Sequence, residues 1–224
     1  MRTAAFQEAR REQQSLLAPL EKRCLLWLAR HAPAWIHSDH LTALGLVALL
    51  GAGLSFWWAG SNPLALYLVV VCLALNWLGD SLDGTLARVR NRQRPRYGFY
   101  VDHVVDAFGA LFLLGGLGLS GFMSERIALG LLVAYLMLSI EVYLATYALG
   151  TFHISFWKFS PTELRILLAI GSLALLRRPD AHLAGTDWKL FDIGGVCGIA
   201  GMGAMLLFAT LKHTVALYRA ERVR

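Results

Sequence analysis

The chain has 224 residues, of which 57% are hydrophobic and 16% are charged. This apolar share exceeds that of ordinary soluble domains and predicts an integral membrane protein. The formal net charge of +6 is typical of a membrane protein that contacts anionic headgroups, and no nucleic-acid partner is expected. The three cysteines lie far apart, so the sequence indicates neither a disulfide framework nor a cysteine metal site.

The first 39 residues are predicted to lie on the membrane surface. Apolar side chains recur there at three- and four-residue spacing with charged side chains between them, which is the pattern of an amphipathic interfacial helix. The charged N-terminus has no adjacent apolar stretch, so a cleaved secretory signal is not expected. We predict a cytoplasmic or interfacial segment over residues 1–39 and a membrane domain over residues 40–224.

Six apolar stretches are predicted to cross the membrane as helices, which makes the expected fold all-α. The first runs from Leu41 to Ala59 with Asp39 as its N-cap, and the second begins at Pro63 and continues through Arg88. The other four cover about residues 99–119, 127–148, 162–176 and 191–218. An even number of spans places both termini on one side of the membrane.

The positions of the basic residues orient these spans. Seventeen Lys and Arg residues fall on the side of the termini and of the connection between the second and third spans, against four on the other side. Because short cytoplasmic loops are enriched in Lys and Arg, the C-terminal end of the second span is expected to face the cytoplasm. A bacterial inner membrane is the expected location.

The second predicted span ends in the sequence DSLDGTLAR, residues 80–88. Asp80, Asp83, Gly84 and Ala87 lie on one stripe of a helix, since they are spaced by three or four residues. Ionised groups are costly at membrane depth, so the two carboxylates require a partner. The two small residues leave a bare patch beside them, with room for a flat ligand.

The third predicted span begins with a second set of residues on one helical face, Gly98, Asp102 and Asp106. A short connection is expected to bring this face against the stripe of the second span. Four convergent carboxylates repel one another unless cations lie between them. All-oxygen ligands suit Mg²⁺ or Mn²⁺, and two such ions form a clamp for a pyrophosphate undergoing displacement.

The two stretches DSLDGTLAR and GFYVDHVVD, nine residues apart, together resemble the signature of the CDP-alcohol phosphotransferases, which are membrane enzymes of phospholipid synthesis. The resemblance implies that an alcohol attacks the β-phosphorus of a CDP-alcohol and releases CMP. It implies metal ligation by Asp80, Asp83, Asp102 and Asp106, with Asp106 also the general base. It further implies a homodimer and a nucleotide site formed by Asp80, Gly84, Ala87, Arg88 and Gly98.

Several other polar residues are possible substrate contacts, each with a structural alternative. His103 is placed to orient Asp106 or contact substrate, as in a similar Asp-His pair of the choline/ethanolamine branch, or simply to face a neighbouring helix. Asn76 lies one turn before Asp80 and either binds a ligand or bridges helices. Lys158 and Arg165 either hold a phosphate or headgroup or act as ordinary cytoplasmic anchors.

Two acidic residues have similar alternatives. The sequence SPTE, residues 160–163, also resembles the choline/ethanolamine branch, which would place Glu163 near the substrate. A capping box at the start of a helix explains the same residues. Glu141 lies in the middle of the fourth predicted span; a partner on a neighbouring helix is one explanation, and the sequence assigns it no role.

The sequence therefore favours an enzyme that uses CDP-diacylglycerol and a small polar acceptor. The alternative within the family is an enzyme that uses CDP-choline or CDP-ethanolamine with diacylglycerol. A cation transporter is the alternative from another class, but its site is expected near the bilayer midplane on broken helices. The carboxylates here lie at one end of two continuous predicted helices.

Overall fold

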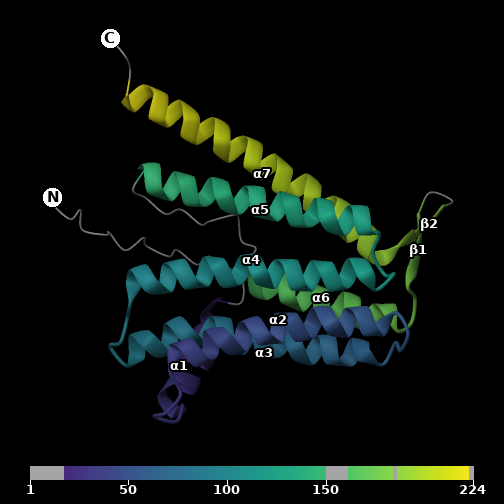
Figure 1. Ribbon diagram of the computed structural model, residues 1–224, viewed down its shortest axis with the longest axis horizontal. Helices are drawn as coiled ribbons and strands as arrows, with labels where there is room; N and C mark the ends of the chain where they lie inside the picture. Colours follow the sequence, from purple (N-terminus) through teal and green to yellow (C-terminus); the bar gives the residue numbers. More distant parts are fainter. Residues whose placement is uncertain (1–17, 150–160, 184–185, 222–224) are drawn as a thin grey trace.

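The computed structural model describes residues 18–149, 161–183 and 186–221. Within these ranges the chain forms seven helices and one two-stranded antiparallel sheet. The long helices run side by side, and the sheet projects from one end of the bundle (Figure 1). The elements are α1 (Ala18–His31), α2 (Ser38–Ala59), α3 (Ala65–Val89), α4 (Pro95–Leu119), α5 (Glu125–Leu149), α6 (Pro161–Leu175), β1 (Asp180–Leu183), β2 (Thr186–Lys189) and α7 (Leu190–Ala220).

Five of the helices, α2, α3, α4, α5 and α7, are long and apolar enough to cross a membrane. They correspond to the first, second, third, fourth and sixth predicted spans. The connection between α3 and α4 lies at the same end of the bundle as the end of α7, as the predicted topology requires (Figure 1). An all-helical fold with several membrane spans is thus confirmed.

The fifth predicted span, about residues 162–176, differs from the expectation. Helix α6 forms there but has only 15 residues in the described part of the chain. At about 1.5 Å per residue it measures about 22 Å, short of the roughly 30 Å of a hydrocarbon core. After α6 the chain forms the β1–β2 hairpin, which the sequence did not predict. The six-span count is therefore not confirmed.

Helix α2 begins earlier than predicted and is not capped by Asp39. Its N-cap is His37, and Asp39 lies in the first turn, where its carboxylate pairs with Arg94. Capping requires a non-helical backbone at the capping residue. His37 meets this condition with φ −111° and ψ 163°, whereas Asp39 is already inside the helix.

Helix α2 forms the centre of the site-bearing half of the bundle, because it packs against both α3 and α4. Close approach to α4 depends on Gly53 and Gly116, where an added Cβ would clash with backbone atoms of the other helix. Close approach to α3 depends on Gly79, where a Cβ would lie 2.5 Å from the Leu41 carbonyl oxygen. Backbones approach closely where side chains are absent, as is usual between membrane helices.

Helices α3 and α4 themselves make at most marginal direct contact. The sequence predicted that a short connection would bring their carboxylate faces together. The short connection is present over residues 90–94, and both helices also pack on α2, which helps to set the spacing between the two acidic faces.

Two apolar clusters hold the bundle together. The larger one joins all the helices from α2 to α7 and includes Phe56, Leu66 and Phe191. The smaller one lies near the acidic residues and packs Leu25 of α1 against Leu82 of α3. Helix α1 thus forms where the interfacial segment was expected, and its position relative to a membrane stays a prediction.

Candidate active site

The acidic stripe of α3 lies in the C-terminal half of one continuous helix. Asp83 is buried, with 8% exposure, and its carboxylate accepts a hydrogen bond of 2.7 Å from the Thr42 hydroxyl of α2. Asp80 is more open, with 35% of its side chain exposed. Gly84 faces open space, since a Cβ there would meet only the tip of the Arg88 guanidinium, 3.6 Å away. The bare patch predicted from the sequence is thus present at Gly84.

Asp80 is held by a cation from another helix. The Arg165 guanidinium of α6 donates to the Asp80 carboxylate at 2.5 Å and to the Asn76 side-chain oxygen at 2.7 Å. The Asn76 amide in turn donates to the Gly45 carbonyl oxygen of α2 at 3.0 Å. Of the two interpretations of Asn76, the structure supports the bridge between helices. Arg165 reaches the acidic site, as the substrate-contact hypothesis requires.

Helix α4 presents its two carboxylates one turn apart. Asp102 is half-buried and Asp106 is exposed. Asp83 lies within electrostatic range of both Asp80 and Asp102, so three of the four predicted ligands are near one another. Gly98 lies in the exposed first turn of α4, and a Cβ there would meet nothing within 4 Å.

Helix α5 adds a stripe of hydroxyl groups that the sequence analysis missed. Tyr135 lies within electrostatic range of Asp106 and Asp80, and Tyr143 lies within range of Asp106. These tyrosines and Ser139 are spaced by four residues and so share one face of the helix. The spacing was visible in the sequence, but nothing in the sequence showed which helix that face would meet.

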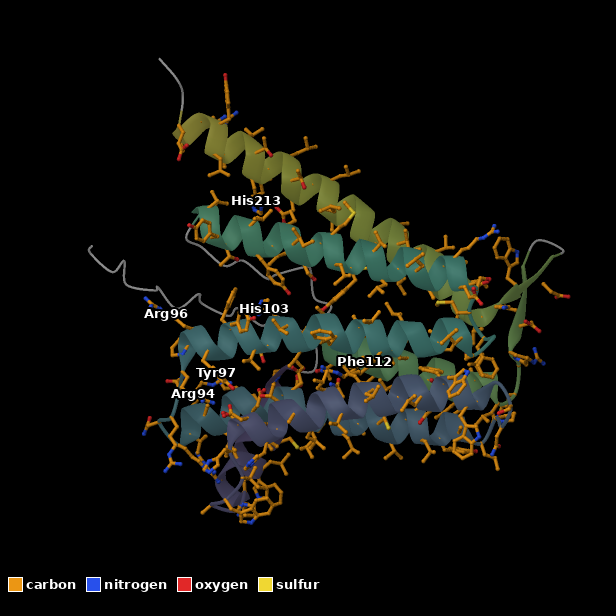
Figure 2. The ribbon with its side chains drawn as sticks, in the orientation of Figure 1. Arg94, Arg96, Tyr97, His103, Phe112 and His213 are labelled. Atoms are coloured by element: carbon orange, nitrogen blue, oxygen red, sulfur yellow. The ribbon has the colours of Figure 1, made fainter. Side chains whose placement is uncertain are left out.

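His103 points from α4 toward α5 (Figure 2). Its ring lies 4.2 Å from the Phe99 ring and 4.5 Å from the Tyr143 ring, between centroids. Its Nδ1 atom lies 2.6 Å from the Phe99 carbonyl oxygen. His103 therefore belongs to an aromatic group between α4 and α5, next to the turn that carries Asp106.

A buried carboxylate on α1 joins two of the helices that form the site. Glu21 is 8% exposed and accepts hydrogen bonds from Trp77 at 2.9 Å, Ser81 at 3.3 Å and Thr162 at 2.8 Å. Trp77 and Ser81 belong to α3, and Thr162 belongs to α6. Glu21 thus fastens the start of α6 to the part of α3 that carries Asp80. No pattern in the sequence indicates this role.

Of the remaining predicted residues, Glu141 and Glu163 lie in described helices, and two others lie outside the described ranges. Glu141 pairs with His213 of α7 at 2.6 Å, which confirms a partner on a neighbouring helix; Figure 2 labels His213. Glu163 lies in the first turn of α6. Lys158 and Ser160 lie outside the described residues, so the capping box at Ser160 is untested.

A basic pocket of about 370 Å³ lies beside Ala87, between the start of α2 and the connection from α3 to α4. Arg90, Arg92 and Arg94 contribute to its lining. The Arg90 guanidinium donates to carbonyl oxygens of the connection between α1 and α2, including that of Ala32 at 2.9 Å. Asp39 also lines the pocket and pairs with Arg94, so the three arginines leave an excess of positive charge for an anionic ligand beside Ala87.

The acidic residues suit a hard divalent cation in their chemistry but are not arranged as a finished metal site. Carboxylate oxygens are the preferred ligands of Mg²⁺ and Mn²⁺, and the neighbouring charges of Asp80, Asp83 and Asp102 favour a cation. Within residues 18–149, 161–183 and 186–221, however, no three acidic, His or Cys side chains converge on one point. Arg165 and Thr42 occupy carboxylate oxygens of Asp80 and Asp83 instead.

These features define a helical integral membrane protein with an acidic site on two continuous helices. A family model described as CDP-alcohol phosphatidyltransferase matches residues 35–214, which is well over half of the chain. The chain therefore belongs to the CDP-alcohol phosphatidyltransferase family, as its motif predicted. The matched range contains every motif residue and begins after α1. No curated protein matches the chain.

Proposed function

We propose that the chain transfers a phosphatidyl group from CDP-diacylglycerol to the hydroxyl of a small polar acceptor and releases CMP. Membership of the family supports the transfer from a CDP-alcohol. The observation that carries the proposal is the placement of Asp80, Asp83 and Asp102 near one another, beside the open face of Gly84. The open face leaves space for the cytidine, and the basic pocket beside Ala87 favours an anionic ligand.

In the proposed reaction, the acceptor oxygen forms a bond to the β-phosphorus while the bond from that phosphorus to the CMP oxygen breaks. Asp106 takes the proton of the acceptor hydroxyl, and the electron pair of the broken bond leaves with CMP. Asp106 is exposed, so an acceptor can reach it. Asp80, Asp83, Asp102 and Asp106 would hold Mg²⁺ or Mn²⁺, two ions in all, whose positive charge stabilises the negative charge that develops on the phosphates.

Residues around the acidic site have supporting roles in this proposal. Thr42 fixes the orientation of Asp83 through its hydrogen bond, and Arg165 supplies positive charge toward the phosphates. The active site faces the cytoplasm because the basic residues gather at that end. A homodimer is proposed from the family resemblance.

The family alternative, a donor of the CDP-choline type with diacylglycerol as acceptor, is supported by one feature. The rings of Phe99, His103 and Tyr143 gather between α4 and α5, and aromatic faces attract quaternary ammonium groups. A transporter is less well supported, because α3 and α4 are continuous helices through the motif whereas transport sites typically lie on broken ones.

The test is CMP release from the purified protein in lipid vesicles. We expect CMP to form from CDP-diacylglycerol when a polar alcohol and Mg²⁺ or Mn²⁺ are present, and to cease when the ions are chelated. CDP-choline with diacylglycerol is assayed in parallel and identifies the donor. Turnover that survives complete chelation, or no CMP from either donor with any alcohol tested, would contradict the proposal.

A further inference from the structure

The pairing between Arg165 and Asp80 has a consequence for metal binding, on the assumption that the proposed function is correct. Asp80 is one of the expected ligands, and its carboxylate oxygen is 2.5 Å from the Arg165 guanidinium. A divalent ion that is bound by both oxygens of Asp80, or by its Oδ2 atom, cannot share the carboxylate with this guanidinium. We propose that Arg165 acts as a built-in competitor, which neutralises Asp80 in the metal-free protein and must move away when the metal binds.

The geometry shows that Arg165 is held in place at this position. Its side chain is only 15% exposed, and its Nε atom donates to Asn76 while its Nη2 atom donates to Asp80. Asn76 is itself 4% exposed and fixed to the backbone of α2. A planar guanidinium fixed at two points loses little freedom for each bond it forms, so it is a strong occupant of the site.

Helix α6 is also fixed by a second polar contact, one turn before Arg165. The Thr162 hydroxyl, one turn before Arg165, donates to the buried Glu21 carboxylate of α1, which accepts bonds from two residues of α3 as well. The start of α6 is therefore fastened to α3 independently of Asp80. Metal binding can thus displace the guanidinium without releasing α6 from the bundle.

The negative charges of the acidic residues explain how Arg165 stabilises the metal-free protein. Without a cation, Asp83 is repelled by Asp80 on its own helix and by Asp102 of α4. Arg165 offsets part of this repulsion with a single positive charge and bonds α6 to α3. A divalent ion brings twice that charge and replaces it, and the displaced guanidinium becomes available to the phosphates of the donor.

The test measures Mn²⁺ binding without substrate, by the electron paramagnetic resonance signal of free Mn²⁺, and thermal stability in the same samples. We expect Arg165→Gln to bind Mn²⁺ about tenfold more tightly than wild type, because a charge-assisted hydrogen bond no longer has to be broken. The metal-free melting temperature should fall, since the acidic residues lose their counter-charge. Saturating Mn²⁺ should restore it.

The matched control is Arg96→Gln. Arg96 is exposed and lies in the first turn of α4, at the end of the bundle that carries the connection from α3 to α4 (Figure 2). Its substitution removes the same charge from the same region, so it reports the general electrostatic effect. We expect its Mn²⁺ affinity to stay close to wild type, as a solvent-screened charge has little influence.

The possible outcomes separate this inference from the proposed function. Equal or weaker Mn²⁺ binding by Arg165→Gln, beside a wild type that binds the ion, overturns the competition and leaves the proposed function standing. An Arg96→Gln variant that gains as much affinity as Arg165→Gln also overturns it. Absence of Mn²⁺ binding in both wild type and Arg165→Gln overturns the inference together with the metal dependence.

A second variant covers the case in which Arg165→Gln does not fold. Arg165→Lys keeps the charge but lacks the planar fork that bonds Asp80 and Asn76 together. We expect its Mn²⁺ affinity to exceed that of wild type by a smaller factor. An affinity equal to or below wild type overturns the competition.

Discussion

Asp106→Asn is expected to reduce the rate of CMP release by about 10²- to 10⁴-fold, the range that a general base contributes. The amide has the shape of the carboxylate but cannot accept the proton of the attacking hydroxyl. Asp106 is exposed, so the substitution should leave helix packing and the melting temperature unchanged. The measurement is the turnover number at saturating CDP-alcohol and Mg²⁺.

The control is Glu125→Gln, which removes an exposed carboxylate from the first turn of α5. This variant should retain wild-type turnover. Mn²⁺ binding measured on Asp106→Asn separates its two proposed roles, because loss of turnover with retained Mn²⁺ affinity supports the base, and loss of both supports the ligand. Full turnover in Asp106→Asn would reject both roles.

Gly84→Ala is expected to weaken binding of the CDP-alcohol by about tenfold or more while leaving the protein folded. The new methyl group would meet only the flexible end of Arg88, at 3.6 Å, and Ala is favoured over Gly within a helix by up to about 1 kcal/mol. Stability should therefore stay level or rise. The methyl group takes the space proposed for the cytidine, so the loss should appear in KM and in equilibrium binding of CDP-alcohol.

Gly79→Ala provides the contrast on the same helix. Its methyl group would lie 2.5 Å from the Leu41 carbonyl oxygen and 2.7 Å from the Gly45 nitrogen, so α2 and α3 must move apart. Overpacking of this kind costs about 1–3 kcal/mol, measured as a lower melting temperature. Gly115→Ala, with nothing within 4 Å, serves as the neutral substitution.

Wild-type nucleotide affinity in Gly84→Ala would remove the case for a cytidine site there.

The sequence predicted the helices well because their signals are local. The first span was expected to end at Ala59, and α2 ends there, since the sequence GSNP that follows does not favour a helix. The second was expected from Pro63 to Arg88, and α3 covers Ala65–Val89. Apolar periodicity and breakers lie within the segment that they define. The short α6 and the hairpin after it have weaker signals and were not anticipated.

The arrangement of the candidate site was less predictable, because it depends on which helices become neighbours. The stripe of Asp80 and Asp83 follows from helical spacing alone. That Thr42 of α2 would bond Asp83, or that Arg165 would reach Asp80 from a point 85 residues later in the chain, does not follow from any local pattern. The hydrogen bonds to Glu21 could not be predicted either, because their three donors come from two segments that are distant in the sequence.

Locating the bound cations in a crystal structure is the most direct test of the proposed metal-dependent transfer. A crystal structure of the protein with Mn²⁺ and a CDP-alcohol, recorded at the manganese absorption edge, locates the ions by their anomalous scattering. We expect anomalous peaks between Asp80 and Asp83 of α3 and Asp102 and Asp106 of α4. Carboxylates that point away from one another, with no peak between the two helices, would contradict the metal-dependent transfer proposed for this chain.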